Sequence, residues 1–479
     1  MNVVITGALF LVMAFALVDG EGLELREPMV PLLPSLFRFR NGSVVRGPND
    51  WGDRRAEIQS LLQEHILGTL PETGSGPRFL SAERINSTAD ESTGAVSAFY
   101  ALHFNVSDGG VMATLAYEIE LLLPKNANDC PLFLTQWNHR GWALTGLSRG
   151  YCSVVYPGSD VRDAAPLLQK AYPRATMMLI IARAKIASMT LDAFFDSASS
   201  DDLPRINKKQ VCITGHSRNG KQSLIAASID ERFSAVVGSS PGAPIASPYH
   251  LSSHNFYGEG PDAGQAGHWW LASTLEYAAH PEKLPVDGNG VIACIAPRRA
   301  AIANGWTDHE GEISYADEAN IRSSMEVFKL FESEKNLTII HRPGDHHGFD
   351  DVNTYFDWFD AGFGRLNLNF ELAWTGQASV SNPFPVSYLT PAGFDWSVWK
   401  SAFGDATPSP PDAKSPIRDR VAWLLQLDGE PRVYSKGATY GESSATGPFR
   451  YIDVMMGRVS FLLFANECSS VTDKNFIIF

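Results

Sequence analysis

The feature that most constrains this chain is a series of short apolar runs separated by longer segments of helical character. Short apolar runs predict buried strands, and helical connections between them predict that the strands pair in parallel. A parallel sheet needs cover on both faces. The sequence therefore predicts an α/β fold, a mostly parallel twisted sheet with helices on both faces. The predicted strands are residues 131–137, 152–156, 210–214, 235–238, 300–304 and 337–341, and the helices include 175–195, 220–230 and 315–331.

Three further segments precede these runs. Residues 98–106 and 113–123 alternate or run apolar, which predicts two antiparallel strands. Residues 51–70 carry apolar side chains at helical spacing, which predicts a surface helix before the main domain.

The charge balance excludes two classes of partner. The 479 residues include 39 Lys and Arg against 53 Asp and Glu, a formal net charge of −14. An acidic protein repels phosphate backbones and anionic lipid headgroups. We therefore expect neither nucleic acid nor a membrane surface as a partner.

The N-terminal segment predicts secretion. Residues 3–18 form one apolar run without a charge, which is shorter than the about 20 residues that span a bilayer and typical of a signal peptide. We expect residues 1–20 to be removed, which leaves an extracellular chain without a membrane attachment. Asn-X-Ser/Thr triplets then become candidate glycosylation sites, and they begin at Asn41, Asn86, Asn105 and Asn336.

The five cysteines are too few for a disulfide scaffold, and their number is odd. Cys130 and Cys152 each open an apolar run that predicts a strand, so they can pair across neighbouring strands. The alternative is that all five are buried free thiols.

A serine follows one predicted strand and precedes a predicted helix, in the sequence VCITGHSRNGK of residues 211–221. A serine on such a turn is the nucleophile elbow of α/β-hydrolases, where the turn pushes Ser217 Oγ out over the sheet. Gly215 supplies a small residue two positions earlier. Asn219 stands where glycine is usual, and Gly220 follows it. The helix N-terminus and the Arg218 backbone N–H would face a developing oxyanion.

A serine nucleophile needs a histidine base and a carboxylate, in the chain order serine, acid, histidine for this fold class. Asp308 follows the predicted strand at 300–304, and two adjacent histidines follow the one at 337–341. The spacing predicts Ser217, Asp308 and His347, with His346 as the alternative base. Competing candidates for the acid are Glu259, Glu310 and Glu312.

Paired histidines also occur in metal sites, but no cluster of carboxylates and histidines at ligand spacing accompanies these. The sequence also lacks a G-x-G-x-x-G fingerprint and a P-loop. We therefore expect no metal, nucleotide or organic cofactor.

The nucleophile turn and several later blocks resemble the glucuronoyl esterase family of carbohydrate esterases, a branch of the α/β-hydrolases. Residues 215–221 (GHSRNGK) are similar to the family's G-C-S-R-x-G-K signature. Residues 257–259 (YGE) with 268–269 (HW), and 284–287 (LPVD) with 295–298 (IAPR), resemble further blocks. The resemblance spans roughly residues 51–365.

The resemblance implies roles for individual residues. Ser217 would be the nucleophile, and Arg218 would add its guanidinium to the oxyanion hole. Lys221 and Glu259 would hydrogen-bond hydroxyls of a uronosyl ring, with Trp269 as a wall of the sugar site.

The sequence departs from the family pattern in three places. The fungal members have a disulfide between a cysteine before the nucleophile and one after the base; here these places resemble His216 and Gly348, which favours His347 as the base. Some members carry the acid soon after the strand that follows the nucleophile, where this chain has residues 238–241 (GSSP), so the acid role falls to Asp308. A tryptophan expected after that aspartate looks replaced by Glu310.

The resemblance thus implies a secreted serine esterase that hydrolyses carboxylic esters of plant cell-wall polysaccharide, most of all 4-O-methyl-glucuronoyl esters, through an acyl-enzyme on Ser217. One alternative is an acetyl xylan esterase or a dienelactone-hydrolase-like esterase. Another is a catalytically inactive, carbohydrate-binding homologue. The predicted organisation is a signal peptide (1–20), a helical lead-in (21–85), an α/β-hydrolase catalytic domain (86–365) and a partly Pro-rich C-terminal extension (366–479) that is not an independent domain.

Overall fold

The computed structural model describes residues 33–72, 76–125, 127–196, 203–252, 266–277, 281–305, 308, 314–342, 346 and 352–365. The predicted signal peptide and C-terminal extension lie outside these residues.

A single nine-stranded sheet organises the described chain, in the order β1-β2-β3-β5-β4-β6-β7-β8-β9. Along the run β5-β4-β6-β7-β8-β9 every neighbouring pair is parallel, as the alternating apolar runs predict. The pairs β1–β2, β2–β3 and β3–β5 are antiparallel. The strands are β1 (Arg78–Ala89), β2 (Val96–Asp108), β3 (Val111–Leu123), β4 (Cys130–Gln136), β5 (Cys152–Tyr156), β6 (Ile206–His216), β7 (Ala235–Ser239), β8 (Arg299–Gly305) and β9 (Leu337–Arg342).

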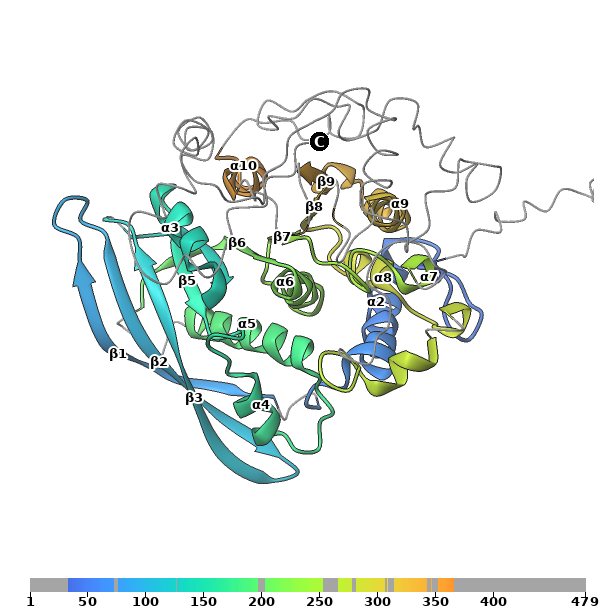
Figure 1. Ribbon diagram of the computed structural model, residues 1–479, viewed down its shortest axis with the longest axis horizontal. Helices are drawn as coiled ribbons and strands as arrows, with labels where there is room; N and C mark the ends of the chain where they lie inside the picture. Colours follow the sequence, from blue (N-terminus) through green and yellow to red (C-terminus); the bar gives the residue numbers. More distant parts are fainter. Residues whose placement is uncertain are drawn as a thin grey trace, which may run out of the picture.

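Helices cover both faces of the sheet (Figure 1). Helices α3 and α10 pack on one face, and α5, α6, α8 and α9 pack on the other, where they share a core with α2. The predicted α/β class is therefore confirmed. The helices are α2 (Pro48–Leu62), α3 (Arg140–Ser148), α4 (Ala165–Ala171), α5 (Leu179–Phe195), α6 (Arg218–Ile229), α7 (Tyr249–Ser252), α8 (Gly288–Ala293), α9 (Ser314–Leu330) and α10 (Val352–Gly362).

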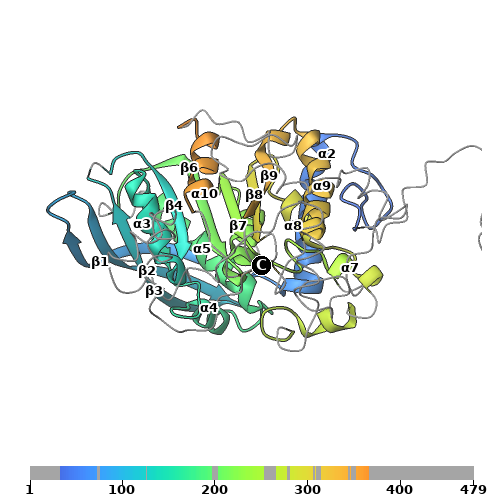
Figure 2. The ribbon, with the colours of Figure 1, turned by 45° about the horizontal axis from the view of Figure 1, so that its top comes forward.

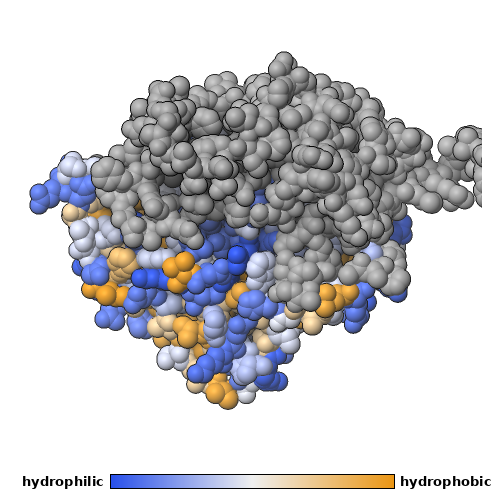
Figure 3. All heavy atoms as spheres, viewed as in Figure 1, coloured by the Kyte–Doolittle hydropathy of each residue, from blue (hydrophilic) through white to orange (hydrophobic). Residues whose placement is uncertain are grey.

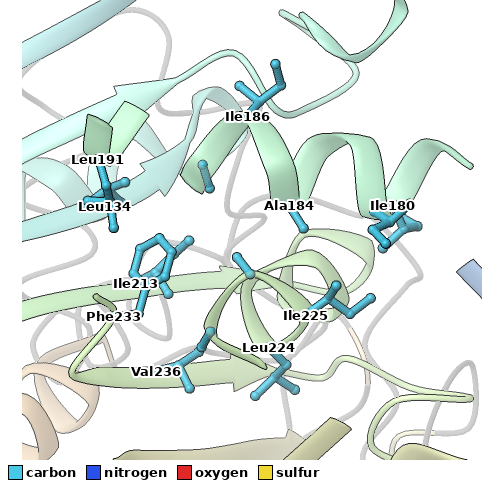
Figure 4. Packing of buried hydrophobic residues seen from close by; sticks show 14 of the residues in the cluster. Leu134, Ile180, Ala184, Ile186, Leu191, Ile213, Leu224, Ile225, Phe233 and Val236 are labelled. Atoms are coloured by element: carbon cyan, nitrogen blue, oxygen red, sulfur yellow. The ribbon is translucent and has the colours of Figure 1, made fainter. Parts of the chain in front are cut away.

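The central strands are apolar because both of their faces are covered. Every residue of β4, β5 and β7 is buried. These strands lie side by side with β6 and β8 in the middle of the molecule (Figure 2). Figure 4 shows side chains of β4, β6 and β7 packed against α5 and α6, among them Leu134, Ile213, Val236, Ile180 and Leu224.

Strand β1 is the strand that the sequence does not reveal among the described residues. It is an edge strand, and almost all of its residues are exposed. A strand without a buried face needs no apolar alternation, which is the signal that predicts strands. Because β1 begins at Arg78, it crosses the predicted boundary between the lead-in and the catalytic domain at residue 86.

The N-terminal lead-in joins the main core. Helix α2 contacts α8, and Trp51, Ile58 and Leu61 are buried in the same cluster as the central strands. The helix predicted at residues 51–70 is present as α2 and the π-helical turn η1 (Gln63–Leu67) that continues it.

A disulfide joins Cys130 to Cys152. Each cysteine opens its strand, and β4 and β5 are neighbours in the sheet. Of the two alternatives left open by the sequence, the pairing of Cys130 with Cys152 is the one present, while Cys212 and Cys294 are buried free thiols.

On the face seen in Figure 3, the coloured residues are a mixture of hydrophilic ones and scattered hydrophobic ones. Within the described ranges, no helix has the length and apolar character that a membrane-spanning segment requires.

Candidate active site

Ser217 occupies a strained turn between β6 and α6. Its backbone lies at φ 57° and ψ −129°, a positive φ that few non-glycine residues adopt. Such a conformation costs on the order of 1–3 kcal/mol and persists only where the surroundings enforce it. Here the Ser217 N–H donates to the Ser239 carbonyl of β7 at 2.8 Å, and the Ser217 carbonyl accepts from Lys221 in the first turn of α6 at 3.0 Å. The turn is the predicted nucleophile elbow.

Two glycines allow the strand, turn and helix to approach this closely. A Cβ added at Gly215 would lie 2.6 Å from the Asn219 carbonyl oxygen, and one at Gly220 would lie 2.8 Å from the Ser239 carbonyl oxygen. Both contacts are with backbone, which cannot move aside cheaply. Gly220, one position after the place where this turn usually has glycine, therefore allows the close contact between α6 and β7.

One imidazole connects the serine to a carboxylate. His346 Nε2 lies 2.9 Å from Ser217 Oγ, and His346 Nδ1 lies 2.8 Å from Asp308 Oδ2. Because a carboxylate only accepts, the Nδ1–H donates to Asp308, which leaves Nε2 to accept from the serine hydroxyl. Asp308 and His346 are each 7% exposed. The acid and the base are thus buried, while Ser217 is partly exposed.

The three residues come from the carboxyl ends of neighbouring parallel strands. Ser217 follows β6, Asp308 follows β8, and His346 follows β9. In an open α/β sheet, ligands bind outside the carboxyl ends of the strands, so the topology brings these residues to the expected edge.

The structure brings His346 to this position, the residue named from the sequence as the alternative base. His347, the preferred base, lies outside the described residues. Glu259, Glu310 and Glu312, the competing acids, also lie outside them.

Ser239, the last residue of β7, carries a hydroxyl in the segment 238–241 and not a carboxylate. Ser239 Oγ lies 3.2 Å from His216 Nδ1 and accepts from the Tyr355 hydroxyl at 3.1 Å. His216, Ser239 and Tyr355 are therefore linked side chain to side chain beside the turn.

Two cations and one indole lie beside the nucleophile. Arg218 Nη1 pairs with Asp160 Oδ2 at 2.8 Å, and its guanidinium carbon lies 4.9 Å from the centre of the Trp269 ring. Lys221 Nζ lies 5.9 Å from the same ring, and the Lys221 residue is 3% exposed. Trp269 thus contacts both Arg218 and Lys221. The sequence predicts Trp269 only as a wall of the sugar site.

His139 lies directly after β4, in the short 3-10 helix η2 (Trp137–His139). Its Nε2 accepts from the His216 backbone N–H at 3.3 Å and lies 3.1 Å from Asn219 Nδ2. These partners flank Ser217 on either side. The ring is 3% exposed and stacks on Trp142 with 4.5 Å between ring centres. Asn219 stands where this turn usually has glycine, and its side-chain amide donates to His139.

Metal binding finds no support in the part of the chain that the structure describes. No group of three or more His, Cys, Asp or Glu side chains there is placed to hold an ion.

The sequence comparisons point to one family. The family described as "Glucuronyl esterase, fungi" matches residues 170–331. The 4-O-methyl-glucuronoyl methylesterase of Cerrena unicolor is 25% identical over 289 residues, covering 58% of this chain and 57% of the relative. The chain thus spans little more than half of that relative's length. The 4-O-methyl-glucuronoyl methylesterase 1 of Phanerochaete chrysosporium is 24% identical over 371 residues, covering 74% and 71%.

Solved structures share the fold. The glucuronoyl esterase from Teredinibacter turnerae superposes with a TM-score of 0.56 at 18% identity, covering 70% of this chain and 89% of that one. The glucuronoyl esterase catalytic domain from Hypocrea jecorina gives 0.54 at 16% identity, covering 74% and 93%.

The fold is that of the α/β-hydrolases, and a serine, a histidine and an aspartate in hydrogen-bonded series are the arrangement of the serine hydrolases among them. Within that class, the chain is similar to the glucuronoyl esterase family of carbohydrate esterases.

We predict that His139→Ala destabilises the nucleophile turn. The change leaves two buried donors, the His216 N–H and the Asn219 amide, without this acceptor. It should lower the free energy of unfolding in urea by about 1–3 kcal/mol. His103→Ala serves as the control, because His103 is a partly exposed histidine on β2. Equal stabilities of the two variants would show that His139 does not brace the turn.

Proposed function

We propose that this protein is a serine esterase that hydrolyses glucuronoyl esters through an acyl-enzyme on Ser217. The observation that carries the proposal is the position of His346, with one ring nitrogen on Ser217 Oγ and the other on Asp308. His346 is the base in this mechanism, in place of the His347 preferred from the sequence.

In the first half-reaction, Ser217 Oγ attacks the ester carbonyl carbon while His346 Nε2 takes the hydroxyl proton. Asp308 accepts from Nδ1–H and stabilises the imidazolium that forms. The tetrahedral intermediate then collapses, its bond to the alcohol oxygen breaks, and His346 returns the proton to the leaving alcohol. The acyl group remains on Ser217.

In the second half-reaction, His346 takes a proton from water, whose oxygen attacks the acyl carbon. Collapse of this second intermediate breaks the bond to Ser217 Oγ, which recovers its proton from His346. The products are the free uronic acid and the alcohol.

The negative charge on the carbonyl oxygen needs donors in both half-reactions. The Arg218 backbone N–H opens α6, where first-turn N–H groups have no partner within the helix. The Arg218 guanidinium adds a charge-assisted donor beside it. Both groups come from the residue that directly follows the nucleophile.

The substrate class is supported by the cations near the serine and by the relatives. Lys221 and Arg218 both lie beside Trp269, which suits a hydroxyl-rich ring bearing a carbonyl at the reacting end. The curated relatives are named 4-O-methyl-glucuronoyl methylesterases. A related fold from Sporotrichum thermophile was solved with methyl 4-O-methyl-β-D-glucopyranuronate. Glu259, predicted to bind a ring hydroxyl, lies outside the described residues.

We predict that the protein hydrolyses methyl 4-O-methyl-glucuronate and benzyl glucuronate in preference to acetylated xylan, because we propose that Lys221 and Arg218 bind the uronoyl group. Product release from each substrate, measured at equal enzyme concentration, gives the ratio of kcat/KM values. A higher kcat/KM on acetylated xylan would favour the acetyl esterase alternative. Sugar binding without turnover of any ester would favour an inactive binding protein.

We predict that the two adjacent histidines differ sharply in a benzyl glucuronate assay. His346→Ala removes the base, so kcat should fall at least about 10³-fold, close to the loss in Ser217→Ala. His347→Ala is the matched control and should keep kcat within about tenfold, since one imidazole completes the series. The reverse ranking would overturn the assignment of the base.

We also propose that the chain is secreted and glycosylated. The disulfide between Cys130 and Cys152 supports this proposal, because such bonds persist in oxidising compartments. Among the four glycosylation triplets, Asn41 and Asn86 are exposed. Asn336 Nδ2, the atom that would carry the sugar, donates to the Pro297 carbonyl at 2.8 Å.

Expression of the full chain in a eukaryotic secretory host tests this proposal. We predict that protein recovered from the culture medium begins near residue 21, carries glycans at Asn41 and Asn86, and lacks one at Asn336. Peptide mapping without reductant should recover a cross-linked pair containing Cys130 and Cys152. Retention of the chain in the cell with residues 1–20 attached would contradict secretion.

A further inference from the structure

We infer that Asp160 is a positioning residue for catalysis, because it holds the guanidinium of Arg218, the residue that directly follows the nucleophile. This inference rests on the proposed function, in which Arg218 donates to the oxyanion. Asp160 lies in the loop after β5, far in sequence from the serine turn, and no motif marks it.

The two oxygens of the Asp160 carboxylate bind two different guanidinium groups. Oδ2 accepts from Arg218 Nη1 at 2.8 Å, and Oδ1 accepts from Arg183 Nη2 at 2.8 Å. Arg183 lies in α5 and is 2% exposed, whereas the Arg218 side chain is 40% exposed. Asp160 therefore links a half-exposed arginine to a buried one.

Arg183 is itself fixed from a second side. Asp163 Oδ2 accepts from Arg183 Nε at 2.9 Å and from Nη2 at 2.6 Å. Two hydrogen bonds to one carboxylate hold a guanidinium in a single plane. Asp163 also accepts from the Ala165 backbone N–H at 2.9 Å, which ties it to the start of α4.

The loop that carries Asp160 is closed on itself. Gly158 and Asp163 form an antiparallel bridge, and the Ser159 N–H donates to the Arg162 carbonyl at 3.0 Å. The Asp160 carboxylate is thus presented from a braced turn, although its side chain is 46% exposed.

Trp269 limits Arg218 from another direction, since the indole ring faces the guanidinium at 4.9 Å. An arginine with this exposure would otherwise sample several rotamers. A donor contributes most to an oxyanion when it needs no reorganisation during the reaction. Asp160 and Trp269 together remove that reorganisation.

The charges in this group also balance. Arg183 and Arg218 face Asp160 and Asp163, so the neutral substrate meets no net charge from these four side chains before reaction. When the carbonyl oxygen becomes negative, Arg218 gains a second anionic partner. The interaction therefore grows in the transition state, and Asp160 should affect kcat more than KM.

A double-mutant cycle tests the inference, with Asp160→Asn, Arg218→Ala and the double variant compared with wild type. Asn keeps the shape of Asp160 and removes its charge. We expect Arg218→Ala to lower kcat by about 10²- to 10³-fold. Asp160→Asn alone should lower kcat about tenfold with KM within about threefold, and it should change kcat less than about twofold when Arg218 is already absent.

Glu118→Gln is the matched control. It removes the ion pair between Glu118 and Arg162, which lies in the same loop two residues from Asp160 and does not contact Arg218. Its kcat should equal that of wild type, and thermal melting should show all variants folded at the assay temperature.

The outcomes separate this inference from the proposed function. Equal losses from Asp160→Asn with and without Arg218 would overturn the positioning role, as would an unchanged kcat in Asp160→Asn. If wild type cleaves phenyl acetate but no glucuronoyl ester, the proposed substrate fails, and the same cycle on phenyl acetate still tests Asp160.

Discussion

The close approach of β6, β7 and α6 around Ser217 is the constraint on which the site depends. Gly215 and Gly220 leave room for backbone contacts that a Cβ would block, and the Ser217 N–H is bound to β7. The serine therefore keeps a positive φ. This conformation is what directs its hydroxyl to His346 rather than into the core. His139 and Asn219 brace the same turn from the side of β4.

Local charge around the site differs from the charge of the whole chain. The protein carries a formal net charge of −14, yet Arg218 and Lys221 lie next to the nucleophile. Lys221 is buried, and a buried cation needs partners because an unpaired buried charge is costly. Trp269 faces both cations, and the carboxylate that pairs with Arg218 comes from the loop after β5. A site for a neutral ester that becomes anionic during reaction is consistent with this balance.

The sequence predicts the parallel strands and the nucleophile turn because both leave local patterns. Strands buried on two faces read as apolar runs, and the turn needs glycines at fixed spacing. Strand β1 leaves no such pattern, since one edge strand with exposed side chains has no apolar face. The choice between His346 and His347 depends on the path of the chain after β9. Two adjacent histidines carry no local sequence signal that distinguishes them. Asp160 gains its position from contacts with Arg183 and Arg218, which are distant in sequence.

The most direct test of the account is the site of reaction with a fluorophosphonate, which modifies a serine only when a base activates it. Wild-type protein is labelled at neutral pH, digested and mapped by mass spectrometry. The account predicts a single adduct on the peptide that contains Ser217, and none in protein unfolded in urea before labelling. An adduct on another serine, or an unlabelled Ser217 in protein that cleaves esters, would contradict the central claim.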